Sequence, residues 1–212
     1  MEDKHSFRLI AITPESGTSL SEIQTICRLL DKDFDYVHVR KPAFTESEMA
    51  HYLETIPEKY HSLLKLHSHF SLIRNFNLGG LHLNHRNPTP PNGFRGHLSA
   101  SCHSAGELQD ISAYEYVFLS PIFDSICKIG YTSRFSADDL ANLHRSGLIN
   151  GKVIALGGMT AERIPDICKW GFGGAAFLGY LFGNPAEPDA RINSIIKTVQ
   201  ICCNSSHIHP RK

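Results

Sequence analysis

Polar side chains that could transfer protons or bind anions follow several short apolar runs of this chain. They are Arg40, His67, His69, His82, His85, Ser101, His103 and Lys128. If the runs form parallel strands of one sheet, the side chains at their carboxyl ends converge at one rim. Histidine has an ordinary pKa of about 6.5, close to neutral pH, so it is suited to accept and return a proton there. Arg40, Ser101 and Lys128 would supply charge or hydrogen bonds to an anionic substrate.

Two apolar runs near the C-terminus end in glycine. They are Lys-Val-Ile-Ala-Leu-Gly-Gly at 152–158 and Gly-Gly-Ala-Ala-Phe-Leu-Gly at 173–179. A glycine lets a backbone N–H approach a phosphate oxygen with no Cβ in the way. In a β/α barrel, the loops after the seventh and eighth strands often form a phosphate site. Gly157, Gly158 and Gly179 therefore predict a phosphorylated small molecule as ligand, and the simpler alternative is that they only permit tight turns.

The elements that must position these residues alternate between strand-like and helix-like segments. Strands are expected at 7–13, 35–40, 63–67, 79–84, 97–102, 116–120, 152–157 and 174–179. Parallel strands joined by helices indicate an α/β fold, and a closed barrel requires eight of them. The sequence therefore predicts a compact, single-domain TIM (β/α)8 barrel.

Helix starts are marked by local capping signals. Ser19, Thr45 and Ser104 are each followed three residues later by glutamate, which is the pattern of a capping box. Further helices are expected to begin at Ser136 and Thr160 and to cover 192–199. The connection 85–95 contains three prolines, which argue against a regular helix there.

The overall composition excludes several classes of protein. Lys plus Arg and Asp plus Glu both number 21, so no nucleic-acid or membrane-binding surface is expected. No apolar run reaches the roughly 20 residues of a membrane span, and the charged N-terminus lacks the apolar stretch typical of a signal peptide. The six cysteines show no framework spacing, which favours reduced thiols and a cytoplasmic location. One barrel domain is expected over 1–200, with a polar tail at 201–212.

Four segments resemble those of a known superfamily. They are Cys-His-Ser at 102–104, Tyr-Val-Phe-Leu-Ser-Pro-Ile-Phe at 116–123, Lys128, and Ala-Leu-Gly-Gly-Met-Thr at 155–160. In this order they are similar to the thiamine phosphate synthase/TenI superfamily, and the resemblance runs from about Leu9 to Phe182. The resemblance implies a small β/α barrel that acts on thiazole phosphate in thiamine biosynthesis, with Lys128 as a phosphate ligand. A homodimer is common among such barrels, but the sequence leaves the oligomeric state open.

The synthases of this superfamily join an aminopyrimidine diphosphate to the thiazole phosphate with Mg²⁺. They carry Gln-x-Arg-x-Lys after the second strand, where this chain has His38-Val-Arg-Lys-Pro42. They also carry aspartates at positions that correspond here to Ser68 and Asn87. Magnesium prefers oxygen ligands and usually one or two carboxylates, so the resemblance to a synthase stops at its metal site. A divergent synthase that binds Mg²⁺ by other residues remains the alternative.

The TenI-type thiazole tautomerases need no metal and no second substrate. They shift a proton to convert a non-aromatic carboxythiazole phosphate into the aromatic tautomer, and the resemblance assigns that transfer to His103. Because His103 precedes the helix start expected at Ser104, the helix dipole is expected to disfavour imidazolium and keep the ring available as a base. A tautomerase that requires no cofactor is therefore the preferred prediction.

Two further readings stay open. His67 and His69 would share one face of an extended strand and, with His85, could bind zinc in a metal-dependent hydrolase. The alternative for these histidines is that they are polar residues lining a pocket. A barrel that binds thiazole or thiamine phosphates without turnover, as a sensor or carrier, is the non-enzymatic reading.

Overall fold

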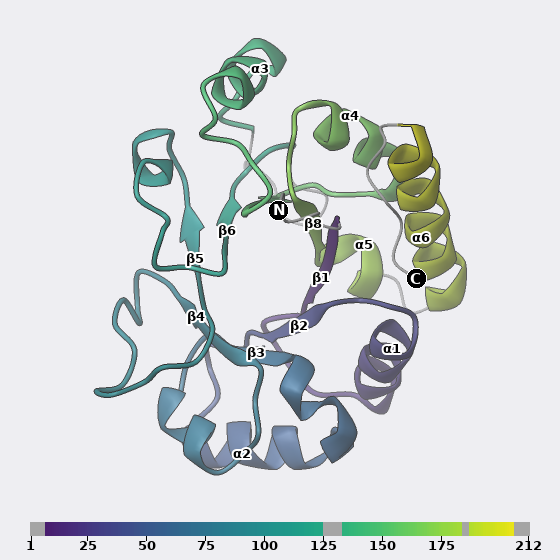
Figure 1. The fold of residues 1–212 in the computed structure, drawn as a ribbon. Helices are drawn as coiled ribbons and strands as arrows, with labels where there is room; N and C mark the ends of the chain where they lie inside the picture. The colour runs from purple at the N-terminus through teal and green to yellow at the C-terminus, as the bar shows by residue number, and fades with distance from the viewer. Residues whose placement is uncertain (1–6, 125–132, 184–186, 206–212) are drawn as a thin grey trace.

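The protein is a closed barrel of eight parallel strands, in the order β1 to β8 around the ring (Figure 1). The computed structural model describes residues 7–124, 133–183 and 187–205. The strands are β1 Arg8–Ile12, β2 Tyr36–Val39, β3 Leu64–Leu66, β4 Gly80–Leu83, β5 Leu98–Cys102, β6 Tyr116–Leu119, β7 Val153–Leu156 and β8 Gly174–Phe177. Each lies within the range expected from its apolar run, which confirms the TIM (β/α)8 barrel.

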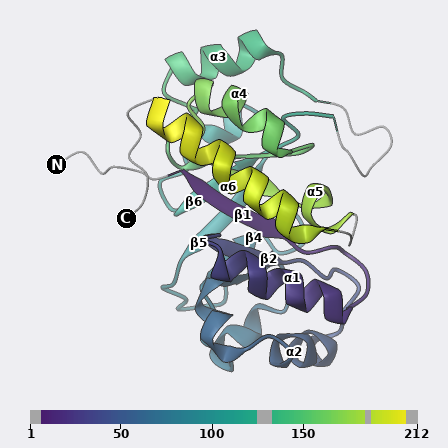
Figure 2. The same ribbon diagram turned by 90° about the vertical axis from the view of Figure 1, so that its right-hand side faces the viewer.

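Helices surround the barrel (Figure 1). The α-helices are α1 Leu20–Asp31, α2 Glu46–Glu54, α3 Ala137–Arg145, α4 Ile164–Lys169, α5 Gly179–Phe182 and α6 Pro188–Ser205. Short 3-10 helices are η1 Glu58–Leu63, η2 Phe70–Arg74, η3 Gly106–Leu108 and η4 Ala161–Arg163. Helix α6 packs against α4 and α1 along the outside of the barrel, as Figure 2 shows.

Of the three capping boxes expected, the one at Thr45 is complete and the one at Ser19 is formed in part. Thr45 and its glutamate form a complete capping box at the start of α2. At α1, Ser19 accepts a hydrogen bond from the N–H of Glu22, but the Glu22 side chain binds elsewhere. Ser136, which was expected only to begin a helix, also heads a capping box, with Asp139.

The helix expected at Ser104 is absent from the structure. The segment forms only the three-residue η3, and the Ser104 hydroxyl donates to the Glu107 carboxylate instead of capping a helix. Gly106 lowers the helix propensity of this segment, and Asp110 accepts hydrogen bonds from Ser112 in a turn directly afterwards. The capping signal was local, and the segment lacks an apolar stripe long enough to extend it.

The barrel has an outer core and an inner core. The outer core lies between the sheet and the helices and holds most of the buried apolar side chains. The inner core is apolar on one side only, where β1 and β6 to β8 contribute Ile10, Ile12, Tyr116, Phe118, Ile154 and Ala176. The inward positions of β2 to β5 are polar and buried: His38, Lys65, His82 and Ser99. The register pairs His38 with Lys65 and His82 with Ser99, so these polar residues are neighbours.

The C-terminal helix continues past the expected domain boundary. Helix α6 ends at Ser205 and so includes the first residues of the tail expected at 201–212. Residues 206–212 lie outside the described part of the chain. None of the helices in the described ranges is long and apolar enough to cross a membrane.

Candidate functional site

A cavity of about 820 Å³ opens at the carboxyl ends of the strands. Six residues expected to form the site line it: Arg40, Ser101, His103, Gly157, Gly158 and Gly179. The volume is within the usual range for small-molecule sites. Lys128, the seventh, lies outside the described residues. The barrel therefore brings together side chains that are far apart in the sequence.

The loop after β7 requires glycine at two successive positions. Gly157 and Gly158 have φ values of +102° and +60°. A Cβ on Gly158 would lie 2.3 Å from the carbonyl oxygen of Asp124, which is backbone and cannot rotate away. The sequence had suggested that Gly179 ends the eighth strand. In the structure β8 ends at Phe177 and Gly179 is the first residue of α5, where it lines the same cavity. Both glycine segments thus border the cavity with bare backbone.

Replacing Gly158 by alanine should lower the free energy of unfolding by about 2–4 kcal/mol, because the left-handed backbone and the contact with Asp124 both resist a Cβ. Gly93 is the matched control. Its φ is +76°, and a Cβ there would meet no heavy atom within 4 Å. Gly93→Ala should cost only the about 1–2 kcal/mol of a left-handed alanine. Urea unfolding measures both variants, and equal costs would contradict the close packing described for Gly158.

His103 lies at the cavity rim with one nitrogen already engaged. Its Nδ1 is 3.0 Å from the carbonyl oxygen of Ser120 in the loop after β6. A carbonyl oxygen only accepts hydrogen bonds, so Nδ1 carries the proton and Nε2 has the basic lone pair. The backbone N–H of His103 donates to Glu107 at 2.8 Å, which holds the chain in place. Because the helix at Ser104 is absent, a helix dipole does not act on this ring, and the Ser120 carbonyl orients it instead.

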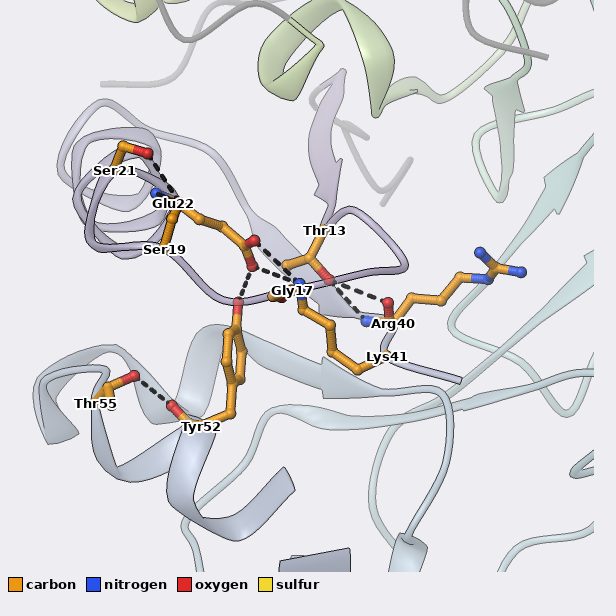
Figure 3. A network of polar contacts seen from close by, with 9 residues as sticks. All are labelled: Thr13, Gly17, Ser19, Ser21, Glu22, Arg40, Lys41, Tyr52 and Thr55. Atoms are coloured by element: carbon orange, nitrogen blue, oxygen red, sulfur yellow. Dashed lines mark hydrogen bonds and ion pairs between the residues drawn. The ribbon is translucent and has the colours of Figure 1, made fainter. Parts of the chain in front are cut away.

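Arg40 is tied to the ends of two strands. Its backbone N–H donates to the Thr13 hydroxyl at 2.9 Å, which joins the ends of β1 and β2 (Figure 3). Its guanidinium pairs with Glu15, and both residues line the cavity. An anionic ligand at this position would share the arginine with Glu15.

Lys41 points away from Arg40 and out of the barrel (Figure 3). It is fully buried, and its Nζ contacts the Glu22 carboxylate of α1 at 2.9 Å and the Gly17 carbonyl at 2.7 Å. The Tyr52 hydroxyl of α2 donates to the same carboxylate. Although Lys41 borders the cavity, its ammonium joins β2 to α1 and α2. Lys41 therefore does not replace the lysine that the synthase pattern places in the active site.

The positions expected for magnesium carboxylates offer a poor donor set. Ser68 and Asn87 both line the cavity, but Asn87 uses its amide N–H to donate to the His67 carbonyl. Among the described residues that line the cavity, the acidic ones are Glu15 and Glu107. Glu15 binds Arg40, and Glu107 accepts from His103 and Ser104. The described residues therefore do not fit a Mg²⁺ site at this position.

Below the cavity, three histidines from adjacent strands form a buried cluster. His38 Nδ1 lies 2.8 Å from His67 Nε2, and His38 Nε2 lies 2.6 Å from the Tyr116 hydroxyl. The rings of His67 and His82 stack with their centroids 4.1 Å apart. His82 contacts the hydroxyls of Ser99 and Ser101 through its two nitrogens, at 3.0 and 2.9 Å. His67 and Ser101 reach the cavity, so the cluster forms part of its floor.

The sequence had placed these histidines differently. His82 is an inward residue of β4, not a rim residue after it. His69 has a left-handed backbone, and its ring contacts the Phe44 carbonyl at 2.7 Å. The set of His67, His69 and His85 is therefore not brought together. His38 was missed as a partner, although its spacing from the end of β2 places it on the inward face.

Burial lowers the pKa of each histidine in the cluster. For His67 the pKa falls to about 3, through burial and then the charge of Arg40. Burial, followed by the neighbouring histidines and Lys65, moves the pKa of His38 and His82 well below the ordinary value. Lys65 lies beneath the cluster, where its ammonium pairs with Glu115 and faces the Tyr36 and Tyr116 rings at 4.1 and 4.4 Å. The three imidazoles are therefore neutral near pH 7.

We expect acid to destabilise the protein through this cluster. Below about pH 6.5 the unfolded histidines take up protons while the folded His67 stays neutral down to about pH 3, so unfolding is favoured as pH falls. The free energy of unfolding should drop by up to about 1.4 kcal/mol per pH unit for each buried histidine. Urea titrations between pH 7.5 and 5 measure this slope. His82→Gln should flatten it and His51→Gln, at a side chain 82% exposed, should not; an unchanged slope in His82→Gln would contradict the prediction.

Known proteins resemble this chain in sequence and in fold. A family model described as thiamine monophosphate synthase (TMP-TENI) matches residues 9–180. A thiamine phosphate pyrophosphorylase structure from Bacteroides thetaiotaomicron is 34% identical, with a TM-score of 0.79, over 95% of this chain and 100% of that one. Another from Pyrococcus furiosus is 15% identical, with a TM-score of 0.71, over 94% and 98% of the two chains, and shares the fold.

No curated protein matches the sequence. The family match nevertheless spans most of the chain and runs from β1 into α5. The family includes enzymes of thiamine biosynthesis that act on small phosphorylated substrates. The chain belongs to the thiamine phosphate synthase/TenI superfamily.

Proposed function

We propose that the protein is a thiazole tautomerase of the TenI type, with His103 as its proton shuttle. The observation that carries the proposal is the orientation of His103. Its Nδ1–H donates to the Ser120 carbonyl, so Nε2 is the atom that can accept a proton. A single histidine meets the demand of this reaction, because the proton removed from one ring position is returned at another and no atom is gained or lost.

The reaction needs the imidazolium to form only briefly. When Nε2 takes the substrate proton, the Ser120 carbonyl oxygen stabilises the resulting charge through the Nδ1–H bond. The same proton then returns from Nε2 to the substrate and restores the neutral ring. His103 is exposed at the cavity rim, so a bound substrate would exclude water from the ring. This would strengthen the hydrogen bond from Nδ1 to Ser120 and the contact of Nε2 with the substrate.

The remaining residues would hold the substrate. Gly157, Gly158 and Gly179 present backbone at the end of the cavity near β7 and β8, which suits the phosphate. Arg40 and Ser101 would contact the carboxylate, and Lys128 is proposed as a phosphate ligand from the family resemblance alone. No cofactor is proposed. The cytoplasmic location stays a prediction.

A divergent thiamine phosphate synthase is the second candidate. The 34% identity to a structure described as thiamine phosphate pyrophosphorylase favours it. Against it, Lys41 is committed to Glu22, and Ser68 and Asn87 stand where the resemblance expects magnesium carboxylates. A synthase would need Mg²⁺ bound by other residues.

One assay distinguishes the candidates. The purified chain is incubated with the non-aromatic carboxythiazole phosphate in the presence of a chelator, and aromatisation is followed by ultraviolet absorbance. Catalysed aromatisation without added Mg²⁺ is the expected result. Magnesium-dependent coupling of aminopyrimidine diphosphate to thiazole phosphate, with no aromatisation, would replace the proposal with the synthase. Binding of thiazole phosphate with neither reaction would identify a sensor or carrier.

A further inference from the structure

The cluster of His38, His67 and His82 is not used by the proposed proton transfer. Its rings come from β2, the end of β3 and β4, and all three are buried. One ligand nitrogen from each lies within 4.8 Å of the other two. Among the described residues, these three histidines are the one group of at least three histidine, cysteine or carboxylate side chains that lie close enough together to hold a metal ion.

We propose that these three histidines form a binding site for a divalent transition metal of the zinc class, beneath the substrate cavity. In a tetrahedral site with Zn–N bonds of about 2.0–2.1 Å, ligand nitrogens lie about 3.3 Å apart. His38 Nδ1 and His67 Nε2 are 2.8 Å apart, with one proton between them. When the metal enters, the ring that carried this proton carries it on its other nitrogen instead, so both ligands stay neutral. The two nitrogens separate slightly as their mutual hydrogen bond is replaced by two metal bonds.

The hydrogen bonds around the cluster suit metal ligation. Metal-bound histidines usually donate their second N–H to an outer partner, which fixes the tautomer and orients the ring. When His38 binds through Nδ1, its Nε2–H donates to the Tyr116 hydroxyl. His82 has a serine on each nitrogen, so whichever one binds the metal, the other retains Ser99 or Ser101 as a partner.

The donor set and the charges select the kind of ion. Three imidazoles suit zinc, cobalt or copper, whereas Mg²⁺ prefers oxygen and is not expected here. The nearest cations are already paired, Lys65 with Glu115 and Arg40 with Glu15. Three neutral ligands leave the ion's charge uncompensated, so the fourth ligand is an anion or a water that the metal makes more acidic. His67 lines the cavity, and that ligand reaches the metal from there.

The test begins with the intact wild-type chain, freed of metal by a chelator and titrated with Zn²⁺. The terminal His207 and His209 could bind metal independently, so the same titration is repeated after both are changed to glutamine. One zinc per chain is expected in each case. X-ray absorption of the zinc-loaded protein should show nitrogen or oxygen neighbours at about 2.0–2.1 Å and none of the sulfur neighbours at about 2.3 Å that cysteines would give. This measurement does not depend on the folding of any variant.

Variants assign the ligands. Loss of an outer hydrogen-bond partner typically weakens metal binding by about 10–100-fold, and Tyr116→Phe should lower zinc affinity within this range. His38→Gln and His82→Gln remove ligands and should lower zinc affinity by more than that. The matched controls are His85→Gln and His69→Gln, which should bind zinc as the wild type does. His85 lines the cavity outside the cluster, and the His69 ring contacts the Phe44 carbonyl. Circular dichroism verifies folding.

Three results would overturn the proposal. The first is that wild-type protein binds no stoichiometric zinc. The second is sulfur in the absorption spectrum, and the third is equal affinity in wild type and His38→Gln. Any of these would mean that the three imidazoles serve only as a hydrogen-bonded polar core. The proposal does not rest on the tautomerase assignment, because binding is measured without substrate.

Discussion

Changing His103 to alanine should reduce the rate of thiazole tautomerisation by about 10²–10⁴-fold, the usual contribution of a positioned acid–base residue. The loss should fall on kcat, because the glycine loops and Arg40 still bind the substrate. His103 is exposed, and among the described residues its ring contacts Ser120 alone, so thermal stability should change little. Absorbance assays at saturating substrate and a thermal unfolding scan measure the two quantities.

The matched control is His85→Ala, because His85 is also an exposed histidine that lines the cavity. Its kcat should remain within a few-fold of the wild type. Added imidazole should restore part of the rate to His103→Ala, since a free base can enter the space left by the ring. If His103→Ala keeps the full rate, or if both variants lose activity equally, His103 does not transfer the proton.

Changing Lys41 to methionine should lower the free energy of unfolding by about 3–5 kcal/mol, because it leaves the buried Glu22 carboxylate without its cation. Lys41 is fully buried and Glu22 is 7% exposed, so little water can compensate. The Tyr52 hydroxyl would remain as the partner of the carboxylate, and the link from β2 to α1 would be lost. Urea unfolding at pH 7 measures the change.

Lys59→Met is the control for this pair. Lys59 pairs with Asp31 at 3.6 Å on the surface, where the side chains are 66% and 58% exposed, and its loss should cost about 0–1 kcal/mol. Lys41→Met should keep kcat at temperatures where it is folded, because its ammonium faces away from the cavity. A variant that stays stable but loses activity would show that Lys41 turns into the site during catalysis.

The barrel could be predicted from the sequence because strand signals are local. Each strand is a short, mostly apolar run bounded by loop residues, and eight such runs alternate with helix patterns. Predicted strand ends were too long by a residue or two, since burial extends past the hydrogen-bonded ladder. The helix at Ser104 was predicted wrongly for a related reason. A capping motif marks a start, but an apolar stripe that packs on the sheet decides whether a helix continues.

The site was only partly predictable. Arg40, Ser101, His103 and the two glycine loops do line one cavity, because parallel strands bring their carboxyl ends to one rim. The direction in which each side chain points was harder to predict from the sequence. Arg40 and Lys41 are adjacent in sequence, directly after β2, yet point in opposite directions (Figure 3).

The sequence by itself determined the barrel, the rim of polar residues and the glycine loops, because each depends on local propensity or on the position of a residue along its own strand. Only the tertiary structure decided how those residues pair. His38 contacts Tyr116 from 78 residues away, and the Ser120 carbonyl holds His103 across 17 residues. Closure of the ring places these groups within hydrogen-bond reach, and the buried polar atoms must then find partners there because water is excluded.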